Sequence, residues 1–500
     1  MALSNRNLYL AALAAFVTLV VLMGVSARHP NPAPAPAGPN VIFIVVDALR
    51  ADRVSAERNG ELVMPNLNAR MERGLRFTGA MTPCTWTKPA MASIFTSMYV
   101  DTHQVFYAVD PEQPDAPTAD VLPEAIETMA SYLKSAGYAT AGIQANGNLV
   151  AQTGFGQGFD EYAFQHDARA DWMTEQGIAR IRRLPRPFFL YLHYMEPHAP
   201  YDPPEPYRSA FGPLPKLAPD EQKVLDNSID YLLDRVYSVF GMRDVRHWPE
   251  LSAQGKEAVR ILYDAECRFA DTELARLFDC IDREAGDTVI VFLADHGEEF
   301  WEHGGMGHGT SMYDEQLSVP LFLQGPGIAP AAVDRRVSTI DVLPTVAGRL
   351  GLRPREAWQG HDLLDAGRAV EPLFSATYST FPRFRLHTDT VVDGDTQLVR
   401  KYIENQYELY DLAADPHEVH NLARDNQGDV RRLDKLLDAH RIANVRHRNQ
   451  CGLKGSADIP RSLLEELQRL GFEITDAGPR PKVELDPETI EHLKSLGYLQ

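Results

Sequence analysis

Cysteine is scarce in this sequence. Only four cysteines occur among 500 residues, and none belongs to a CxxC pair or to a Cys/His group with zinc-finger spacing. Cys267 and Cys280 are expected on one helix, where their separation in sequence places them roughly 20 Å apart, too far for a disulfide. The cysteines therefore predict ordinary buried thiols rather than a disulfide scaffold.

Positive charge is also in short supply. Lys and Arg total 49 residues against 69 for Asp and Glu, which gives a formal net charge of −20. An acidic surface repels nucleic acid and anionic lipid headgroups, so neither a nucleic-acid partner nor a polyanionic macromolecular substrate is expected. A local positive site can still bind one small anion.

The first part of the chain is typical of an export signal. Arg6 precedes an apolar run at residues 8–27, and the run ends in the small residues "VSA". Its length fits either a cleaved signal peptide or a single-span membrane anchor. Residues 28–39 are Pro-rich and predict a stiff linker. The rest of the chain is expected outside the cytoplasm, on the periplasmic or extracellular face, anchored or secreted.

The body of the sequence predicts an α/β fold. Five short runs are apolar throughout, as expected for strands covered on both faces: residues 40–46, 139–145, 187–194, 288–294 and 319–325. Amphipathic helices are predicted between them at 124–138 and 257–283, the second with one break. This alternation predicts a mostly parallel sheet sandwiched by helices, with its active site at the carboxyl ends of the strands.

The sequence pattern changes along the chain and divides the rest of it into three predicted segments. Residues 40–365 are predicted to form the catalytic domain and 366–425 a smaller α+β subdomain, in which 400–423 reads as two strands, a turn and a helix. Residues 426–500 are predicted to be a helical tail. Two similar stretches in this tail, 463–472 and 489–498, predict short helices that dock through Leu467, Leu470, Leu493 and Leu496.

Polar residues that suit a divalent metal follow two of the predicted strands. Asp47 comes directly after the run at 40–46, and Asp295 and His296 come directly after the run at 288–294. Carboxylates and an imidazole that meet at one sheet edge can hold a divalent cation.

Thr87 precedes a predicted helix in the stretch "PCTWTKPAMASIFTS". Pro89 fits the first turn of a helix that begins near Thr87. The start of a helix binds oxyanions, and metal coordination can activate a hydroxyl for attack. A simple helix cap is the alternative explanation for Thr87.

The chain resembles the sulfatase family of the alkaline phosphatase superfamily over residues 40–425. Six blocks carry the resemblance, in order "VIFIVVDALRADRVS", "MPNLNARMERGLRFTGAMTPCTWTKPAMASIFTS", "PFFLYLHYMEPHAPYDPP", "FLADHGEEFWEHGGMGHGTSMYDEQLSVPLFLQGPG", "VSTIDVLPTV" and "ELYDLAADPHEVHNLA". The resemblance implies a large α/β domain with a smaller C-terminal subdomain. It also implies a divalent metal and attack on a sulfate or phosphate ester by a metal-held nucleophile.

The nucleophile position departs from the family pattern. Sulfatases carry Cys or Ser followed by x-Pro-x-Arg, and the first residue is oxidised to formylglycine. The aligned stretch here begins with Thr87, which cannot be converted, and the Arg is replaced by Met91. Cys84 does not restore the pattern, because Trp86 rather than Pro lies two residues on. We therefore expect no formylglycine and direct attack by Thr87, as in phosphodiesterase and phosphoethanolamine-transferase branches of the superfamily.

The metal is left open by the sequence. Sulfatases often have paired Asp residues at the first strand end, whereas Val46 precedes Asp47 here. His296 is a nitrogen ligand that suits Zn²⁺ or Mn²⁺, and relatives with an Asp-His pair and Ca²⁺ keep that ion in consideration.

The resemblance to the sulfatase family implies further site residues. The resemblance implies that His198 and His308 hold the leaving oxygen or donate its proton, and that Glu196 could join them at a second metal. His193 is expected to be a buried strand residue. Substrate or anion contacts are expected from the following residues, with a surface position as the alternative for the last two: Asn146, His303 and Lys88.

These features favour a hydrolase of small phosphate mono- or diesters that works through phosphorylated Thr87. The alternatives are a sulfatase without formylglycine, a phosphoethanolamine-type transferase and a non-catalytic binding module. A single candidate span argues against the transferase, and the joint presence of Asp47, Thr87, Asp295 and His296 argues against the binding module. The natural substrate and the oligomeric state do not follow from the sequence.

Overall fold

The computed structural model describes residues 38–107, 118–226, 250–365, 367–378, 387–402, 404–453 and 482–495. All of these residues belong to one compact unit, Gly38–Gln500. The apolar run at residues 8–27 and most of the Pro-rich linker lie outside them. Within the described residues, no helix has both the length and the apolar character needed to cross a membrane.

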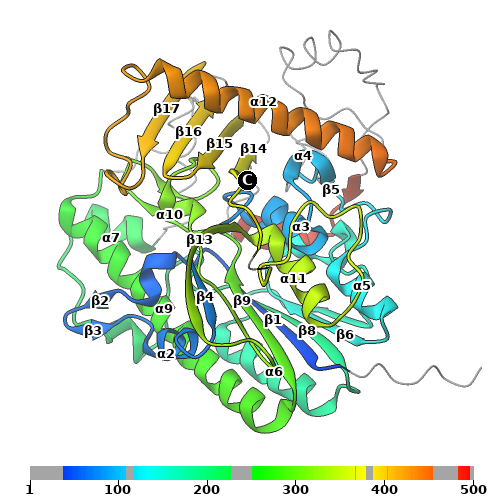
Figure 1. The fold of residues 1–500 in the computed structure, drawn as a ribbon. Helices are drawn as coiled ribbons and strands as arrows, with labels where there is room; N and C mark the ends of the chain where they lie inside the picture. Colours follow the sequence, from blue (N-terminus) through cyan, green and yellow to red (C-terminus); the bar gives the residue numbers. More distant parts are fainter. Residues whose placement is uncertain are drawn as a thin grey trace, which may run out of the picture. The chain divides into compact units, whose positions relative to one another are not determined.

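An eight-stranded sheet forms the centre of the fold (Figure 1). In order across the sheet, its strands are β13 (Ala331–Ser338), β4 (Leu75–Met81), β12 (Leu321–Gln324), β9 (Thr288–Ala294), β1 (Asn40–Val46), β8 (Phe188–Tyr194), β6 (Ala139–Gln144) and β7 (Glu161–Phe164). All neighbouring pairs are parallel except those made by β12, which runs antiparallel to both β9 and β4. The mostly parallel sheet is therefore confirmed.

All five apolar runs form strands, and three further strands were not predicted. β4, β7 and β13 carry polar residues because they lie toward the two ends of the sheet, where burial is incomplete. The edge strand β13, for example, reads AAVDRRVS. An apolar run marks a strand only where both faces are covered.

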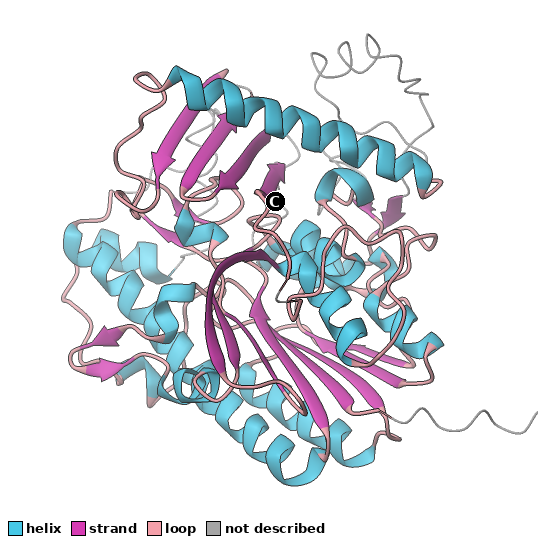
Figure 2. Cartoon of the chain, viewed as in Figure 1, coloured by secondary structure: helices cyan, strands magenta, loops and turns pink. Residues whose placement is uncertain are grey.

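Helices cover the sheet in two groups (Figure 2). One group contains α2 (Pro65–Met71), α6 (Ala170–Arg183) and α9 (Ala253–Cys280), of which α9 contacts both of the others. The other contains α3 (Thr87–Thr96), α5 (Met129–Ser135) and α11 (Val342–Arg349). Helices on both faces bury the central strands, and every residue of β1, β8 and β9 is buried.

Two predicted helices differ from the observed ones. The helix expected at 124–138 is shorter, because Thr128 caps α5 by accepting the backbone N–H of Ser131 at 3.1 Å. The helix expected to break within 257–283 is instead continuous as α9, and Ile281–Ala285 forms a π-helical turn after it.

A second, antiparallel sheet follows the first. It consists of β14 (Leu373–Tyr378), β15 (His387–Asp393), β16 (Thr396–Lys401) and β17 (Gln406–Asp411), and α12 (Gln427–Gln450) packs on it. The helix predicted just after the two strands of 400–423 is wrong. The side chains of Asp411 and Asp415 accept backbone N–H groups of the following loop, for example that of His420 at 2.8 Å, and so favour turns over a helix.

The last described helix is α14 (Pro487–Ser495), which docks on the body of the protein. Its Leu493 is buried in a cluster with Trp86 and Phe106, as predicted for this residue. The other leucines proposed for docking, Leu467, Leu470 and Leu496, lie outside the described residues.

The packing of α12 on the second sheet leads to a stability prediction. Leu433 is fully buried in a cluster with Val391, Leu398 and Leu409. We expect Leu433→Ala to lower the free energy of unfolding by about 2–5 kcal/mol, because it removes buried contacts and leaves a cavity. The exposed neighbour Lys435 provides the control, since Lys435→Ala should change stability by less than about 0.5 kcal/mol. Denaturant unfolding followed by fluorescence measures both, and equal effects would contradict this packing.

Candidate active site

The register of two parallel strands places Asp47 beside Asp295. β1 pairs with β9 so that Val46 lies opposite Ala294, and each of these residues is followed directly by an aspartate. Both aspartates are fully buried, as is His296. The ligand atoms of Asp47, Asp295 and His296 lie within 4.8 Å of one another. The structure thus brings together the three residues that the sequence proposed for one metal ion.

Thr87 points its hydroxyl at this group. Oγ1 of Thr87 lies 3.4 Å from each carboxylate oxygen of Asp47 and 3.3 Å from Nε2 of His296. The residue in the capping position is Trp86, whose backbone is extended, and Thr87 is the first residue of α3. The capping explanation for Thr87 therefore fails.

The donor set suits a divalent cation. Nδ1 of His296 lies 2.9 Å from the carbonyl oxygen of Gly297, which can only accept, so Nδ1 carries the proton and Nε2 is free to bind a metal. Oδ2 of Asp295 is buried and has no hydrogen-bond partner among the described residues. Two adjacent buried carboxylates with one oxygen left unsatisfied call for a cation.

The pKa values of these three residues show how strongly their charges interact. Burial acts to raise the pKa of Asp47, but His198, His193 and His296 together hold it well below its usual value. Burial and the neighbouring Asp47 raise the pKa of Asp295. Burial acts to lower the pKa of His296, yet Asp295 and Asp47 raise it to about 9.

Two further residues fix the orientation of Asp47. Nδ2 of Asn146 donates to Oδ2 of Asp47 at 2.8 Å, and Nε2 of His193 lies 3.0 Å from the same oxygen. Because the carboxylate can only accept, Nε2 of His193 donates, and its Nδ1 accepts from the Tyr191 hydroxyl at 2.7 Å. His193 is indeed a buried strand residue, but it also contacts the site. The parallel pairing of β1 and β8, with Val45 opposite His193, brings this residue to the site.

Three imidazoles lie next to one another: those of His296, His308 and His198. The ring centroid of His308 lies 4.3 Å from that of His296 and 4.9 Å from that of His198. Nδ1 of His308 lies 2.9 Å from the carboxylate of Glu298. Nδ1 of His198 lies 2.6 Å from the carbonyl oxygen of Ala199, and its Nε2 has no hydrogen-bond partner among the described residues.

Glu298 is a site residue that sequence reasoning missed. It is fully buried, and besides His308 it accepts a hydrogen bond from the Tyr201 hydroxyl at 3.1 Å. Burial acts to raise its pKa, but His308, His198 and His296 bring it below the usual value, so Glu298 is ionised. Its place two residues after His296, just past a predicted strand, was the available signal.

Three predicted site residues lie elsewhere. Glu196 accepts the backbone N–H of Ala170 at 3.0 Å, and burial raises its pKa to about 7. Within the described part of the chain, no group of close metal ligands combines Glu196 with His198 and His308. The residues proposed for a second metal are therefore not assembled.

His303 and Lys88 also have other surroundings than expected. His303 stacks on Tyr313 with ring centroids 3.6 Å apart and pairs with Glu315 at 3.4 Å. Lys88 is fully buried, which excludes a solvated lysine at the helix start. Burial lowers the pKa of Lys88 to about 7, and the charged group that acts against this is Asp120 rather than a member of the Asp47 group.

Cys84 is buried and unreactive. Burial raises the pKa of its thiol to about 12, and its Sγ lies 3.9 Å from the hydroxyl of Thr377. All four cysteines of the chain are free thiols, and three of them are buried as the sequence predicted, whereas Cys451 is partly exposed.

A mostly parallel, helix-covered sheet carries carboxylates and histidines at the ends of two central strands. A model of the sulfatase family matches residues 39–352, and the chain belongs to this family. The resemblance seen in the sequence is thereby confirmed, and the protein is an ester hydrolase.

Relatives and solved structures agree with this placement. The chain is 26% identical over 460 residues to an uncharacterised sulfatase of Escherichia coli (strain K12), which covers 80% of this chain and 86% of that protein. Its fold is similar to that of a 2-O GAG sulfatase, with a TM-score of 0.64, 20% identity, and 83% and 93% of the two chains covered. It is also similar to a phosphonate monoester hydrolase from Silicibacter pomeroyi, with a TM-score of 0.62, 21% identity and coverage of 81% and 96%.

The contact between Tyr191, His193 and Asp47 predicts an effect on activity. We expect Tyr191→Phe to lower kcat/KM by roughly 10- to 100-fold, because the imidazole that orients Asp47 loses its own partner. Tyr194 is the matched control: it lies on the same strand, is equally buried, and hydrogen-bonds Thr174 at 2.9 Å away from the site. Tyr194→Phe should leave kcat/KM within about 3-fold of the parent. Equal losses in hydrolysis of nitrophenyl esters by the two variants would show that Tyr191 only supports the strand.

Proposed function

We propose that this protein is an exported, metal-dependent hydrolase of phosphate esters, with mono- and diesters favoured, and that Thr87 is its nucleophile. The observation that carries the proposal is the placement of Thr87 Oγ1 at 3.3–3.4 Å from His296 and Asp47. Thr87 also begins α3, where backbone N–H groups and the helix dipole favour a tetrahedral anion. Export is proposed from the apolar run at residues 8–27.

Asp47, Asp295 and His296 would hold the metal, with Thr87 as a further ligand. Such an ion supplies positive charge that lowers the pKa of a hydroxyl and stabilises the charge of the transferred group. Asn146 and His193 keep the Asp47 carboxylate in one orientation. The hydroxyl of Thr87 donates toward that carboxylate, which directs an oxygen lone pair away from Asp47.

The reaction would proceed in two displacements. Thr87 Oγ1 forms a bond to phosphorus while the bond from phosphorus to the leaving oxygen breaks, and the Thr87 proton passes to the carboxylate of Asp47. The leaving oxygen takes a proton from the imidazole pair His198 and His308. Water then attacks the phosphorus and gives one proton to the same imidazole pair, the bond from phosphorus to Thr87 Oγ1 breaks to release the phosphate, and Asp47 returns its proton to Thr87.

Glu298 positions His308 for this role. Its ionised carboxylate accepts from Nδ1 of His308 and fixes the orientation of that ring. His198 is held in a similar way by the carbonyl of Ala199. The centroids of the two imidazoles lie 4.9 Å apart.

Sulfate esters are the second candidate substrate class. The relatives named as sulfatases favour them, and the phosphonate monoester hydrolase favours a phosphorus centre. Turnover of nitrophenyl phosphate, bis-nitrophenyl phosphate and nitrophenyl sulfate compares the classes directly. Faster turnover of the sulfate ester would move the assignment to a sulfatase that uses Thr87.

Replacement of the nucleophile tests the proposal. We expect Thr87→Ala to lower kcat by about 10³-fold or more, because the attacking oxygen is lost while the helix start remains. Thr87→Ser keeps the hydroxyl and should retain much more activity. Cys84→Ala should stay within about 5-fold of the parent, since that thiol is buried and protonated.

A formylglycine mechanism predicts the opposite ranking. A Thr87→Ala enzyme with near-normal turnover, together with an oxidised Cys84 in the mass spectrum, would overturn the assignment of Thr87.

Replacement of one proposed metal ligand should lower the amount of metal that the protein binds. We expect Asp295→Asn to lower the content of tightly bound divalent metal by about one ion per chain, because it removes an anionic ligand from a buried set. The exposed Asp220 offers a control, and Asp220→Asn should leave the content unchanged. Elemental analysis of protein dialysed against metal-free buffer measures both. An unchanged metal content in Asp295→Asn would refute this ligand set.

A further inference from the structure

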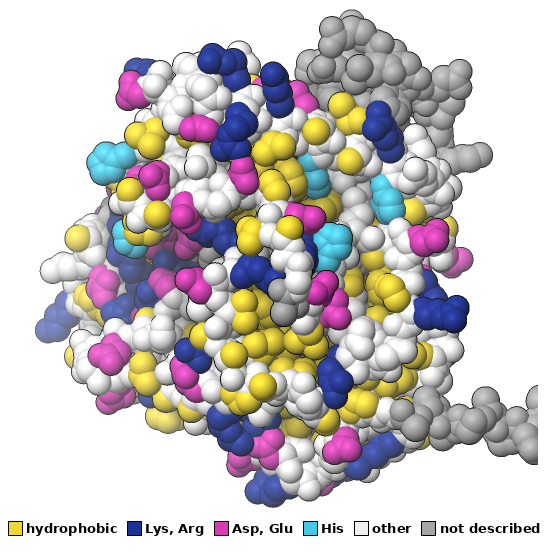
Figure 3. Space-filling model, viewed as in Figure 1, with side chains coloured by type: hydrophobic (Ala, Val, Ile, Leu, Met, Phe, Trp, Pro, Cys, Tyr) yellow, Lys and Arg dark blue, Asp and Glu magenta, His cyan; other side chains and the backbone are white. Residues whose placement is uncertain are grey.

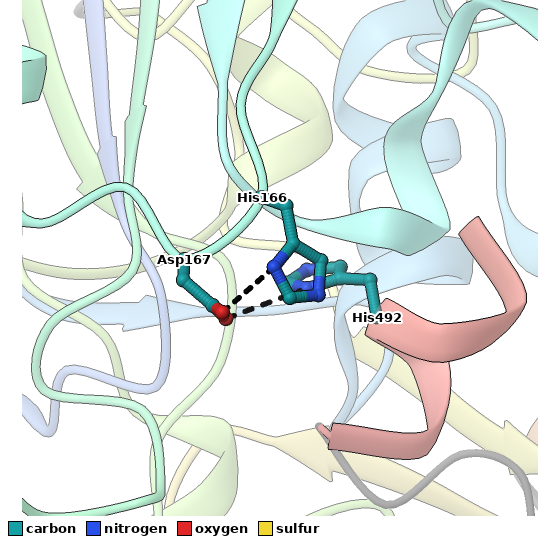
Figure 4. Close-up of side chains that lie close together, drawn as sticks. All are labelled: His166, Asp167 and His492. Atoms are coloured by element: carbon teal, nitrogen blue, oxygen red, sulfur yellow. Dashed lines mark ion pairs between the residues drawn. The ribbon is translucent and has the colours of Figure 1, made fainter. Parts of the chain in front are cut away.

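A second group of metal-binding side chains joins the C-terminal helix to the body of the protein (Figure 4). His166 and Asp167 follow β7, the strand at one edge of the large sheet, and His492 lies on α14. One ligand atom from each residue lies within 4.8 Å of the other two. None of these residues takes part in the reaction proposed above.

The three side chains are arranged around Asp167. Its carboxylate oxygens lie 2.7 Å from Nδ1 of His166 and 3.9 Å from Nδ1 of His492, the two pairs drawn in Figure 4. The two imidazole centroids are 4.3 Å apart, with the ring planes at 70°. Such an arrangement leaves ring nitrogens of both histidines directed into the space that the three residues share.

These nitrogens lack partners, although they are buried. Only 1% of His492 is exposed; the backbone of Ala145 lies near its ring, but neither ring nitrogen makes a hydrogen bond of ordinary geometry to a described residue. Nε2 of His166 is likewise buried and unpartnered in the described part of the chain. A buried histidine whose ring nitrogens are unsatisfied is costly unless a ligand is bound.

We propose that His166, Asp167 and His492 bind one divalent transition metal of the Zn²⁺ class, which fastens α14 to the body of the protein. Two imidazoles and a carboxylate are a typical three-residue donor set for this class, with water at the fourth position. The exposed Asp167 side chain, 69% accessible, provides the path by which the ion and its water reach the group. Bond lengths of about 2.0–2.2 Å require only small movements of side chains that already lie this close.

The position of α14 links this metal to the active-site loop. A Cβ atom on Gly147 would lie 2.5 Å from Cδ2 of His492, so the helix approaches the loop as closely as glycine allows. Gly147 directly follows Asn146, whose amide orients Asp47. A metal that holds His492 in place would therefore also steady the loop that carries Asn146.

Zn²⁺ binding tests this proposal in a protein that lacks one anionic ligand of the active-site group. The background is Asp295→Asn, which removes the other expected metal. We expect one equivalent of Zn²⁺ to bind per chain of Asp295→Asn in equilibrium dialysis. We also expect backbone amide exchange in residues 487–495 to slow when Zn²⁺ is added. Adding His492→Gln should weaken this binding by roughly 100-fold or more and abolish the slowing.

Two further variants guard against misfolding of His492→Gln. Asp167→Asn changes an exposed side chain and should weaken Zn²⁺ binding without loss of the folded state, whereas His420→Ala, at an 80% exposed histidine, should change nothing. Absence of Zn²⁺ binding to Asp295→Asn, or full binding by both His492→Gln and Asp167→Asn, would overturn the proposal. This test is independent of the test of the nucleophile, because Thr87→Ala should abolish turnover and leave Zn²⁺ binding at His166, Asp167 and His492 intact.

Discussion

The rest of the site depends on two carboxylates that parallel strand pairing forces together. Val46 lies opposite Ala294 in the pairing of β1 with β9, so Asp47 and Asp295 leave the sheet side by side in a fully buried position. Like charges this close are stable only with compensating positive charge. The nearby histidines supply part of it, and a divalent cation would supply the remainder. The carboxylate of Asp47 also accepts from the hydroxyl of Thr87 and from the side-chain amide of Asn146.

The layers around the sheet hold this charge arrangement in place. On the face of the molecule drawn in Figure 3, acidic, basic and hydrophobic side chains are interspersed. β8 contributes His193 on the side of β1 away from β9, and Tyr191 on the same strand fixes its tautomer. Thr87 is the first residue of α3, a helix in which every residue is buried. Two further imidazoles, those of His308 and His198, lie next to this group, and the carboxylate of Glu298 and the carbonyl oxygen of Ala199 accept from their Nδ1 atoms.

Much of this could be predicted from the sequence, for a physical reason. The strands that carry Asp47 and Asp295 are apolar throughout because both of their faces are buried, and such runs are easily recognised. The polar edge strands β4, β7 and β13 give no such signal. The contacts of His193, Glu298 and His303 depend on strand order and loop path, which the local sequence does not specify. Nor does it show that His166 and His492, over 300 residues apart, meet.

The central claim is that Thr87 forms a covalent bond to the transferred group. Rapid acid quenching during turnover of a phosphate monoester, followed by peptide mass spectrometry, tests it most directly. The account predicts a phosphoryl group on Thr87 in the parent and none in a Thr87→Ala protein. A phosphoryl group on any other residue, or turnover under conditions where Thr87 never becomes labelled, would contradict it.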